Sequence, residues 1–103
     1  MVLVRVPMEI EIIVKWKIKE SETARILAML PELADRSKCE KGNVFYTIYR
    51  SKNDPHEFIL HELYTDADAF EAHKTSEYYQ RIVVGEIIPH LVLREVTFVN
   101  KLL

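Results

Sequence analysis

The amino-acid sequence predicts an α+β fold, in which a four-stranded antiparallel sheet carries helices on one face. Two patterns lead to this prediction. Apolar and polar residues alternate with period two in residues 8–19, and apolar residues recur at mostly three- and four-residue steps in residues 24–34. The segments follow in the order strand, helix, strand, strand, helix, strand, which is the split βαβ arrangement called ferredoxin-like.

The composition is that of an ordinary globular domain. Of the 103 residues, 49% are hydrophobic and 29% are charged, so we expect one domain over residues 1–103, with its core at about 8–100. The formal net charge is −2 and the Lys and Arg residues are scattered, which argues against a surface for nucleic acid or an anionic membrane. Because Cys39 is the only cysteine, we expect a reducing compartment, the cytoplasm.

Residues 8–19 have the clearest strand pattern, because every second residue from Met8 to Ile18 is apolar and most of those between are charged. Proline cannot donate to a strand ladder, so Pro7 is expected to mark the start of this strand. Residues 1–7 are expected to form an extension or an extra edge segment. Charged residues interrupt the apolar opening stretch, so we expect neither a signal peptide nor a membrane span there.

A helix is expected after this strand, with Ser21 as its N-cap and Glu22 favourable in its first turn. Pro31 lies inside the helical pattern and removes a backbone hydrogen bond, so a kink or a break into two short helices is predicted there. Residues 41–43 are expected to end the helical region and turn the chain. The apolar stripe of this region comprises Ala24, Leu27, Ala28, Leu30, Leu33 and Ala34, and Ile26 widens it.

Residues 44–50 and 57–65 are rich in β-branched and aromatic residues and flank a polar loop, so they predict a β-hairpin. We take Arg50 to pair with Glu57, although a slip of one residue would change the pairs without changing the faces within each strand. In this register one face carries Val44, Tyr46, Ile48, Ile59, His61 and Leu63, and the other carries Phe45, Tyr49, Phe58, Leu60, Glu62 and Tyr64.

The last part of the chain predicts a helical region and a strand. Residues 65–68 supply a helix N-cap and early acidic residues, and Ser76 is expected to cap a second helical segment that ends at Pro89. Residues 91–99 form the final predicted strand.

The expected fold covers only one face of its sheet. Apolar side chains occur on both faces of the predicted hairpin, so the uncovered face needs a partner. A second copy of the same sheet is the simplest cover. We therefore expect a two-fold homodimer, in which the two sheets form a dimeric α+β barrel.

Three blocks of sequence resemble the pattern of the antibiotic biosynthesis monooxygenase family. They are residues 40–46 (EKGNVFY), 58–64 (FILHELY) and 69–79 (AFEAHKTSEYY), and their order and spacing match over about residues 8–100. The family typically has an acidic residue before the glycine of the first block. The chain departs from the pattern at His61, where the family has an aromatic residue, and at Tyr78, where it often has histidine.

The resemblance implies an enzyme. The family includes quinol and anthrone monooxygenases that use no flavin, haem or metal, so it implies a cofactor-independent oxidation of a small phenolic, quinol or anthrone-like substrate by dioxygen. The block around His73 is also similar to the autoinducer-2-processing branch, which implies isomerisation or processing of a small phosphorylated signalling molecule. A haem-degrading branch is disfavoured, because residues 82–84 lack its axial histidine. A non-catalytic small-ligand-binding dimer is a further alternative.

His73 and Glu62 are the predicted catalytic residues. As a general base, His73 would remove a phenolic or enolic proton and leave an anion that reacts with dioxygen; the alternative is a half-buried structural histidine. Glu62 shares a strand face with apolar residues, so its ionised form would be costly if buried. It is predicted to accept a proton or to orient His73, and the alternative is an ion pair with Arg50, Arg94 or Lys101.

Aromatic residues are expected to line an apolar substrate pocket between the sheet and the helices, with tyrosine hydroxyls steadying an oxyanion. Contacts of the core and the dimer are the alternative role. The predicted substrate-binding residues are Trp16, Tyr46, Tyr64, Phe70, Tyr78 and Tyr79.

No cofactor or metal site is predicted. The chain has only two glycines and no phosphate-binding loop, and its four histidines show no ligand spacing. A phosphorylated substrate would instead require a basic pocket, in which Arg50, Arg81 or Arg94 clusters with His73.

Overall fold

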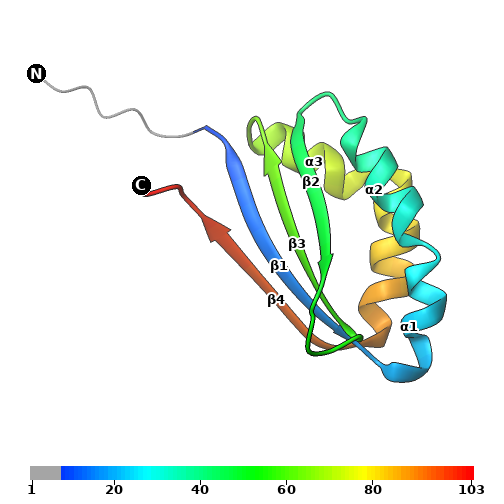
Figure 1. Cartoon of the computed structure of the whole chain (residues 1–103). Helices are drawn as coiled ribbons and strands as arrows, with labels where there is room; N and C mark the ends of the chain where they lie inside the picture. The colour runs from blue at the N-terminus through cyan, green and yellow to red at the C-terminus, as the bar shows by residue number, and fades with distance from the viewer. Residues whose placement is uncertain (1–7) are drawn as a thin grey trace, which may run out of the picture.

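Four antiparallel strands form one sheet in the order β2-β3-β1-β4, and all the helices pack on one of its faces (Figure 1). The computed structural model describes residues 8–103, so the expectations for residues 1–7, including Pro7, lie outside the described part. The predicted ferredoxin-like α+β fold is confirmed. Its elements are β1 (Ile10–Ile18), α1 (Glu20–Leu27), α2 (Leu30–Lys38), β2 (Asn43–Arg50), β3 (Glu57–Tyr64), α3 (Ala67–Thr75), the π-helix η1 (Tyr79–Ile87), the 3-10 helix η2 (Ile88–His90) and β4 (Leu91–Val99).

The hairpin of β2 and β3 differs from the prediction by one residue of register. Arg50 lies opposite Phe58 and not Glu57. The backbone N–H of Ser51 donates a hydrogen bond to the carbonyl of Glu57, which extends the pairing into the loop. This shift places Tyr46 opposite Glu62, so both side chains lie on the face that the helices cover. Tyr46 and Ile48 therefore share a face with Leu60 and Glu62, and not with His61 as predicted.

The predicted N-cap at Ser21 is wrong. Helix α1 begins at Glu20, and no side chain caps it; the carbonyl of Lys19 accepts hydrogen bonds from the Glu22 N–H and the Thr23 hydroxyl. Thr23 is buried and its hydroxyl also lies 2.8 Å from His56 Nδ1. The side of α1 that carries Thr23 and Ile26 therefore faces the core, and Ile26 is fully buried.

Other features of the helical layer agree with the sequence. Pro31 lies in the first turn of α2, so the expected break into two helices is confirmed. Asp66 caps α3 by accepting from the Ala69 N–H at 2.8 Å, and Ser76 Oγ accepts from the Tyr79 N–H where the next helical segment starts. The predicted burial of Ala24 and Ala28 is wrong, because both face solvent.

None of the helices within residues 8–103 combines the length and the apolar character that crossing a lipid bilayer requires.

Gly42 lies in close contact with α3. Its carbonyl accepts from the Thr65 N–H at 2.9 Å, and a Cβ on Gly42 would overlap the Cβ of Ala69. The turn before β2 and the start of α3 are therefore in contact through a position with no side chain. This contact matters for the site described below, because α3 carries a histidine and the turn carries Glu40.

Gly42→Ala is expected to lower the free energy of unfolding by about 1–3 kcal/mol, because the added methyl must push α3 away. Thermal and chemical denaturation measure the loss. Gly85→Ala is the matched control: its new Cβ would lie 3.4 Å from the Gln80 carbonyl, an ordinary contact, so little destabilisation is expected. Equal stability of the two variants would contradict the tight contact at Gly42.

Candidate functional site

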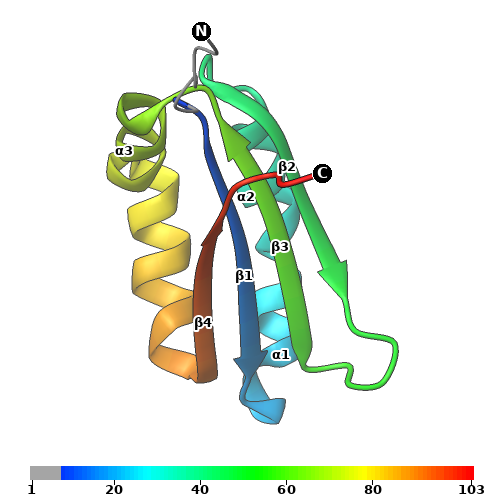
Figure 2. The same cartoon turned by 90° about the vertical axis from the view of Figure 1, so that its left-hand side faces the viewer.

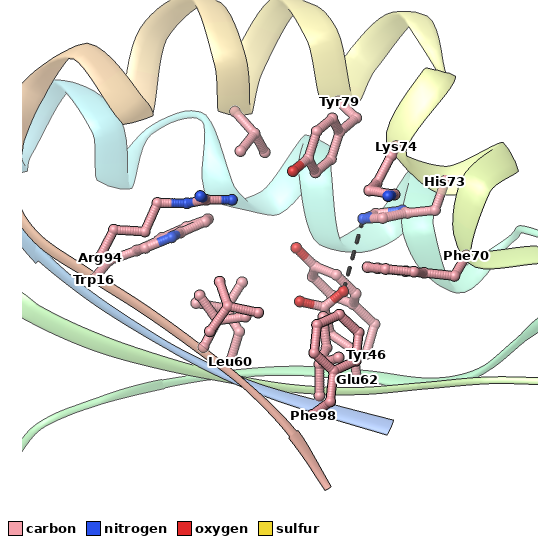
Figure 3. A pocket seen from close by; sticks show the side chains of 14 residues that line it. Trp16, Tyr46, Leu60, Glu62, Phe70, His73, Lys74, Tyr79, Arg94 and Phe98 are labelled. Carbon is pink, nitrogen blue, oxygen red and sulfur yellow. Dashed lines mark ion pairs between the residues drawn. The ribbon is translucent and has the colours of Figure 1, made fainter. Parts of the chain in front are cut away.

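A cavity of about 260 Å³ lies between the helix-covered face of the sheet and the segment formed by α3 and η1 (Figure 3). It is mostly apolar, but acidic and basic side chains also line it, a combination typical of small-molecule sites. The residues that line it are Ile12, Val14, Trp16, Tyr46, Leu60, Glu62, Phe70, His73, Lys74, Tyr79, Val83, Arg94, Val96 and Phe98.

His73 lies in the last turn of α3 with only 2% of its surface exposed. Its Nδ1 lies 2.9 and 3.1 Å from the two carboxylate oxygens of Glu40, and the Tyr78 hydroxyl also donates to that carboxylate. A carboxylate that receives two hydrogen bonds is an acceptor, so we assign the Nδ1 hydrogen to this bond. In the neutral imidazole the other nitrogen, Nε2, is then free to accept a proton.

Glu62 and His73 both line the cavity and lie beside each other. The 3.7 Å between His73 Nε2 and Glu62 Oε1, dashed in Figure 3, is too long for a direct hydrogen bond. Glu62 is 3% exposed and accepts a 2.6 Å hydrogen bond from the Tyr64 hydroxyl. Burial raises the pKa of its carboxyl, and the Tyr64 hydrogen bond and the nearby His73 offset only part of that rise.

The ion pair considered for Glu62 is not present among the described residues. None of the Lys or Arg side chains in residues 8–103 pairs with Glu62, and His73 is the basic side chain beside it. Glu62 is therefore a buried carboxyl that faces a histidine and a cavity. Such pairs are commonly found where proton transfer takes place.

The tyrosines around the two residues remain proton donors. Burial raises the pKa of Tyr46, and the charge of Glu62 raises it further. The same two causes raise the pKa of Tyr64, while burial and the Glu40 hydrogen bond raise the pKa of Tyr78 to about 12. Their hydroxyls are protonated at neutral pH and can donate to an anion, but they do not compete with His73 as bases.

Four of the six residues predicted to bind substrate line the cavity together with His73 and Glu62. The other two, Tyr64 and Tyr78, lie behind it, and each donates a hydrogen bond to a carboxylate of the site. The four lining residues are Trp16, Tyr46, Phe70 and Tyr79.

Glu40 and Lys74 were not predicted as site residues, and Arg94 was considered only for a basic pocket or as an ion-pair partner of Glu62. Glu40 holds His73 through Nδ1, and the one sequence signal for it was the acidic residue before Gly42 in the family pattern. Lys74 and Arg94 both line the cavity. The other two arginines considered for a basic pocket do not line it: Arg50 donates to the Pro55 carbonyl, and Arg81 pairs with Glu32 and Glu77.

Within residues 8–103 no three His, Cys, Asp or Glu side chains are grouped closely enough to hold a metal ion. The arrangement instead offers acid–base groups in a mostly apolar cavity. A histidine with one fixed nitrogen, a carboxyl with a raised pKa and several neutral hydroxyl donors together suit removal and return of a proton on a small aromatic molecule.

Known structures share this fold. A crystal structure of an antibiotic biosynthesis monooxygenase superposes with a TM-score of 0.84 at 21% identity, covering 90% of this chain and 98% of that chain. A Mycobacterium tuberculosis protein gives 0.82 at 21% identity, with 91% and 95% covered. A Pseudomonas aeruginosa protein gives 0.82 at 20% identity, with 93% and 96% covered.

Comparison with curated proteins finds no match to the sequence. The sequence profile of the antibiotic biosynthesis monooxygenase family, in contrast, matches residues 10–84. This span begins at β1 and includes Glu40, Glu62 and His73, and it covers most of the chain. The chain therefore belongs to the antibiotic biosynthesis monooxygenase family.

Proposed function

We propose that the protein is a cofactor-independent monooxygenase that oxidises a small phenolic, quinol or anthrone-like substrate with dioxygen. The observation that carries this proposal is the pair of buried acid–base groups, His73 and Glu62, that face one cavity while Glu40 fixes the far side of the imidazole. Family membership supports a monooxygenase role. The chemistry asks only for groups that move protons, because the substrate itself supplies the electrons.

The reaction balances for a ring methylene next to a carbonyl. His73 Nε2 removes one C–H or enol proton, and the resulting anion forms a C–O bond with dioxygen. Glu62, whose pKa is raised, returns a proton to the peroxide. Loss of the second C–H proton then breaks the O–O bond, so that one oxygen atom becomes the product carbonyl and the other leaves as water. The methylene carbon supplies all the electrons that reduce dioxygen.

The surroundings favour this chemistry. The lining of the cavity is mostly apolar, so an anion formed there is poorly solvated and electron-rich. Tyr46 and Tyr79 line the cavity as neutral hydroxyl donors and can stabilise the charge that forms on the substrate oxygen.

Oxygen consumption by metal-free protein with a panel of hydroquinones and anthrones tests the proposal. His73→Ala is expected to reduce kcat by about 10²–10⁴-fold, because it removes the base. Glu40→Gln is expected to reduce it less, because the imidazole remains but its Nδ1 is held by a neutral group. Asp68→Asn, an exposed change on the same helix, is the control. No oxygen uptake with any substrate would overturn the proposal and favour a non-catalytic binder.

Glu62→Gln separates chemistry from structure. Burial raises the pKa of Glu62, so its contribution to stability is present below the pKa of the unfolded chain and is lost as the pH rises through the folded pKa. Glutamine cannot ionise and can still accept from Tyr64. We therefore expect the variant to melt at or above the wild-type Tm at about pH 8, with the difference shrinking toward about pH 4, while oxygen uptake falls. A variant that loses stability most at high pH would show that the carboxylate is structural.

Processing of a phosphorylated molecule is the second candidate function. It is favoured by the basic residues Arg94 and Lys74, which line the same cavity as His73. However, Lys74 pairs with Glu71 at 3.1 Å, and Glu62 and Glu40 place acidic groups near His73. The oxygenase proposal accounts for these acids more directly, since a phosphate would be repelled by them.

We further propose that the protein works as a homodimer that pairs the uncovered faces of two sheets. Figure 2 shows that the helices lie behind the sheet and leave its other face open. Exposed apolar side chains on this face include Ile13, Tyr49 and Leu93. On the cavity side, Val96 and Phe98 line the cavity but remain exposed, so a partner near β4 would shield them.

Ile13→Lys is expected to convert the dimer to a monomer, because it places a charge at the centre of the proposed contact. Light scattering coupled to size-exclusion chromatography measures the mass. Val84→Lys is the matched control, because Val84 is 41% exposed on the helical layer and Ile13 is 40% exposed on the sheet. A monomeric wild-type protein at micromolar concentration would contradict the proposal.

A further inference from the structure

Trp16 carries a buried N–H group that none of the described residues accepts. The side chain is almost fully buried, and the indole lines the cavity. Within residues 8–103 the Nε1 atom has no hydrogen-bond partner. Buried donors are nearly always paired, since a lost hydrogen bond to water must be replaced. An unpaired donor in the wall of a cavity therefore points to an acceptor on the ligand.

Arg94 lies next to this N–H. The two residues are cross-strand partners on β1 and β4, and both line the cavity. Figure 3 shows the indole of Trp16 and the guanidinium of Arg94 together at one end, whereas His73, Lys74 and Phe70 lie at the other. The cavity thus has an acid–base end and a second end with two kinds of N–H donor.

The guanidinium of Arg94 is available to a ligand. In the described part of the chain Arg94 forms no ion pair, whereas three other arginines pair with glutamates on the surface. Its charge and its hydrogen bond to the Tyr79 hydroxyl offset part of the rise that burial causes in the pKa of Tyr79, and the guanidinium has further N–H groups for a ligand. A guanidinium beside an apolar cavity is suited to a carboxylate, because its N–H groups match the two oxygens of that group.

We propose that Trp16 and Arg94 form a carboxylate subsite, and that the ligand is a small aromatic acid whose hydroxyl group faces His73 and Glu62. One carboxylate oxygen accepts from the indole N–H and the other from the guanidinium. This inference rests on the proposed function for the position of the hydroxyl, and it adds the class of substrate.

Size and lining agree with such a ligand. A cavity of about 150 Å³ binds benzene in another protein, so about 260 Å³ leaves room for a ring with two polar substituents. Tyr46, Phe70 and Tyr79 offer aromatic surfaces to the ring.

Binding of 4-hydroxybenzoate and of 4-hydroxybenzamide under anaerobic conditions tests the subsite without turnover. Trp16 is the only tryptophan, so its fluorescence reports directly on this end of the cavity. The acid is expected to bind at least about tenfold more tightly than the amide, which has the same shape and no charge. Arg94→Gln is expected to abolish that preference, and Arg50→Gln, the same change outside the cavity, is expected to preserve it.

Trp16→Phe keeps an aromatic ring and removes the N–H, so calorimetry is expected to show weaker binding of the acid to this variant. If this buried change unfolds the protein, Arg94→Gln still decides the question, because Arg94 is exposed.

Two results would overturn the subsite. One is equal binding of acid and amide, or no binding of either. The other is an Arg94-dependent preference for 4-hydroxyphenyl phosphate over the acid, which would assign this end to phosphate. Because no oxygen is consumed in these titrations, failure here leaves the oxygenase proposal standing. Failure of oxygen uptake likewise leaves a measured carboxylate preference intact.

Discussion

The candidate site of this protein depends on one carboxyl, Glu62, that is buried in the middle of an apolar sheet. Glu62 lies on β3, a central strand, among side chains such as Leu60 and Phe58 that exclude water. Within residues 8–103 no lysine or arginine neutralises it, and the Tyr64 hydroxyl and the His73 ring lie beside it instead. Burial of the carboxyl without a cationic partner lowers the stability of the fold at high pH. It also leaves a group that can exchange a proton with a ligand.

The topology determines which segments can reach that carboxyl. In the order β2-β3-β1-β4 the central strands are β3 and β1, so Glu62 and Trp16 lie under the helices while Arg94 enters from the edge strand β4. Helix α3 returns over the same face with His73, and the turn after α2 brings Glu40 to its far side. A close contact at Gly42 keeps that turn against α3, so the orientation of the imidazole depends on backbone packing.

The sequence predicted what depends on local patterns and missed what depends on distant contacts. Period-two alternation identified β1, and β-branched and aromatic residues around a polar loop identified the hairpin. The alternation of side chains along a strand placed Glu62 correctly on the face of Phe58 and Tyr64. The hairpin register was one residue off, because a loop hydrogen bond of Ser51 sets it. Glu40 could not be assigned to His73, since the two are 33 residues apart and meet only through the turn at Gly42. Tyr64 had the right face, but the spacing could not show that its hydroxyl would serve a carboxylate.

The two ends of the cavity have different effects on an anion. In the proposed reaction His73 deprotonates the substrate and negative charge enters its ring, and an unneutralised Arg94 at the far end would attract that charge. Such an attraction would stabilise the resting anion more than the transition state, in which charge moves from the ring toward dioxygen, so it would slow the attack on dioxygen. A carboxylate bound to Trp16 and Arg94 removes this effect by neutralising the guanidinium before the proton is lost. The ring then keeps its electron density, and the same contacts hold its hydroxyl against His73. In this proposal the carboxylate bound by Trp16 and Arg94 both holds the substrate and preserves its reactivity at His73.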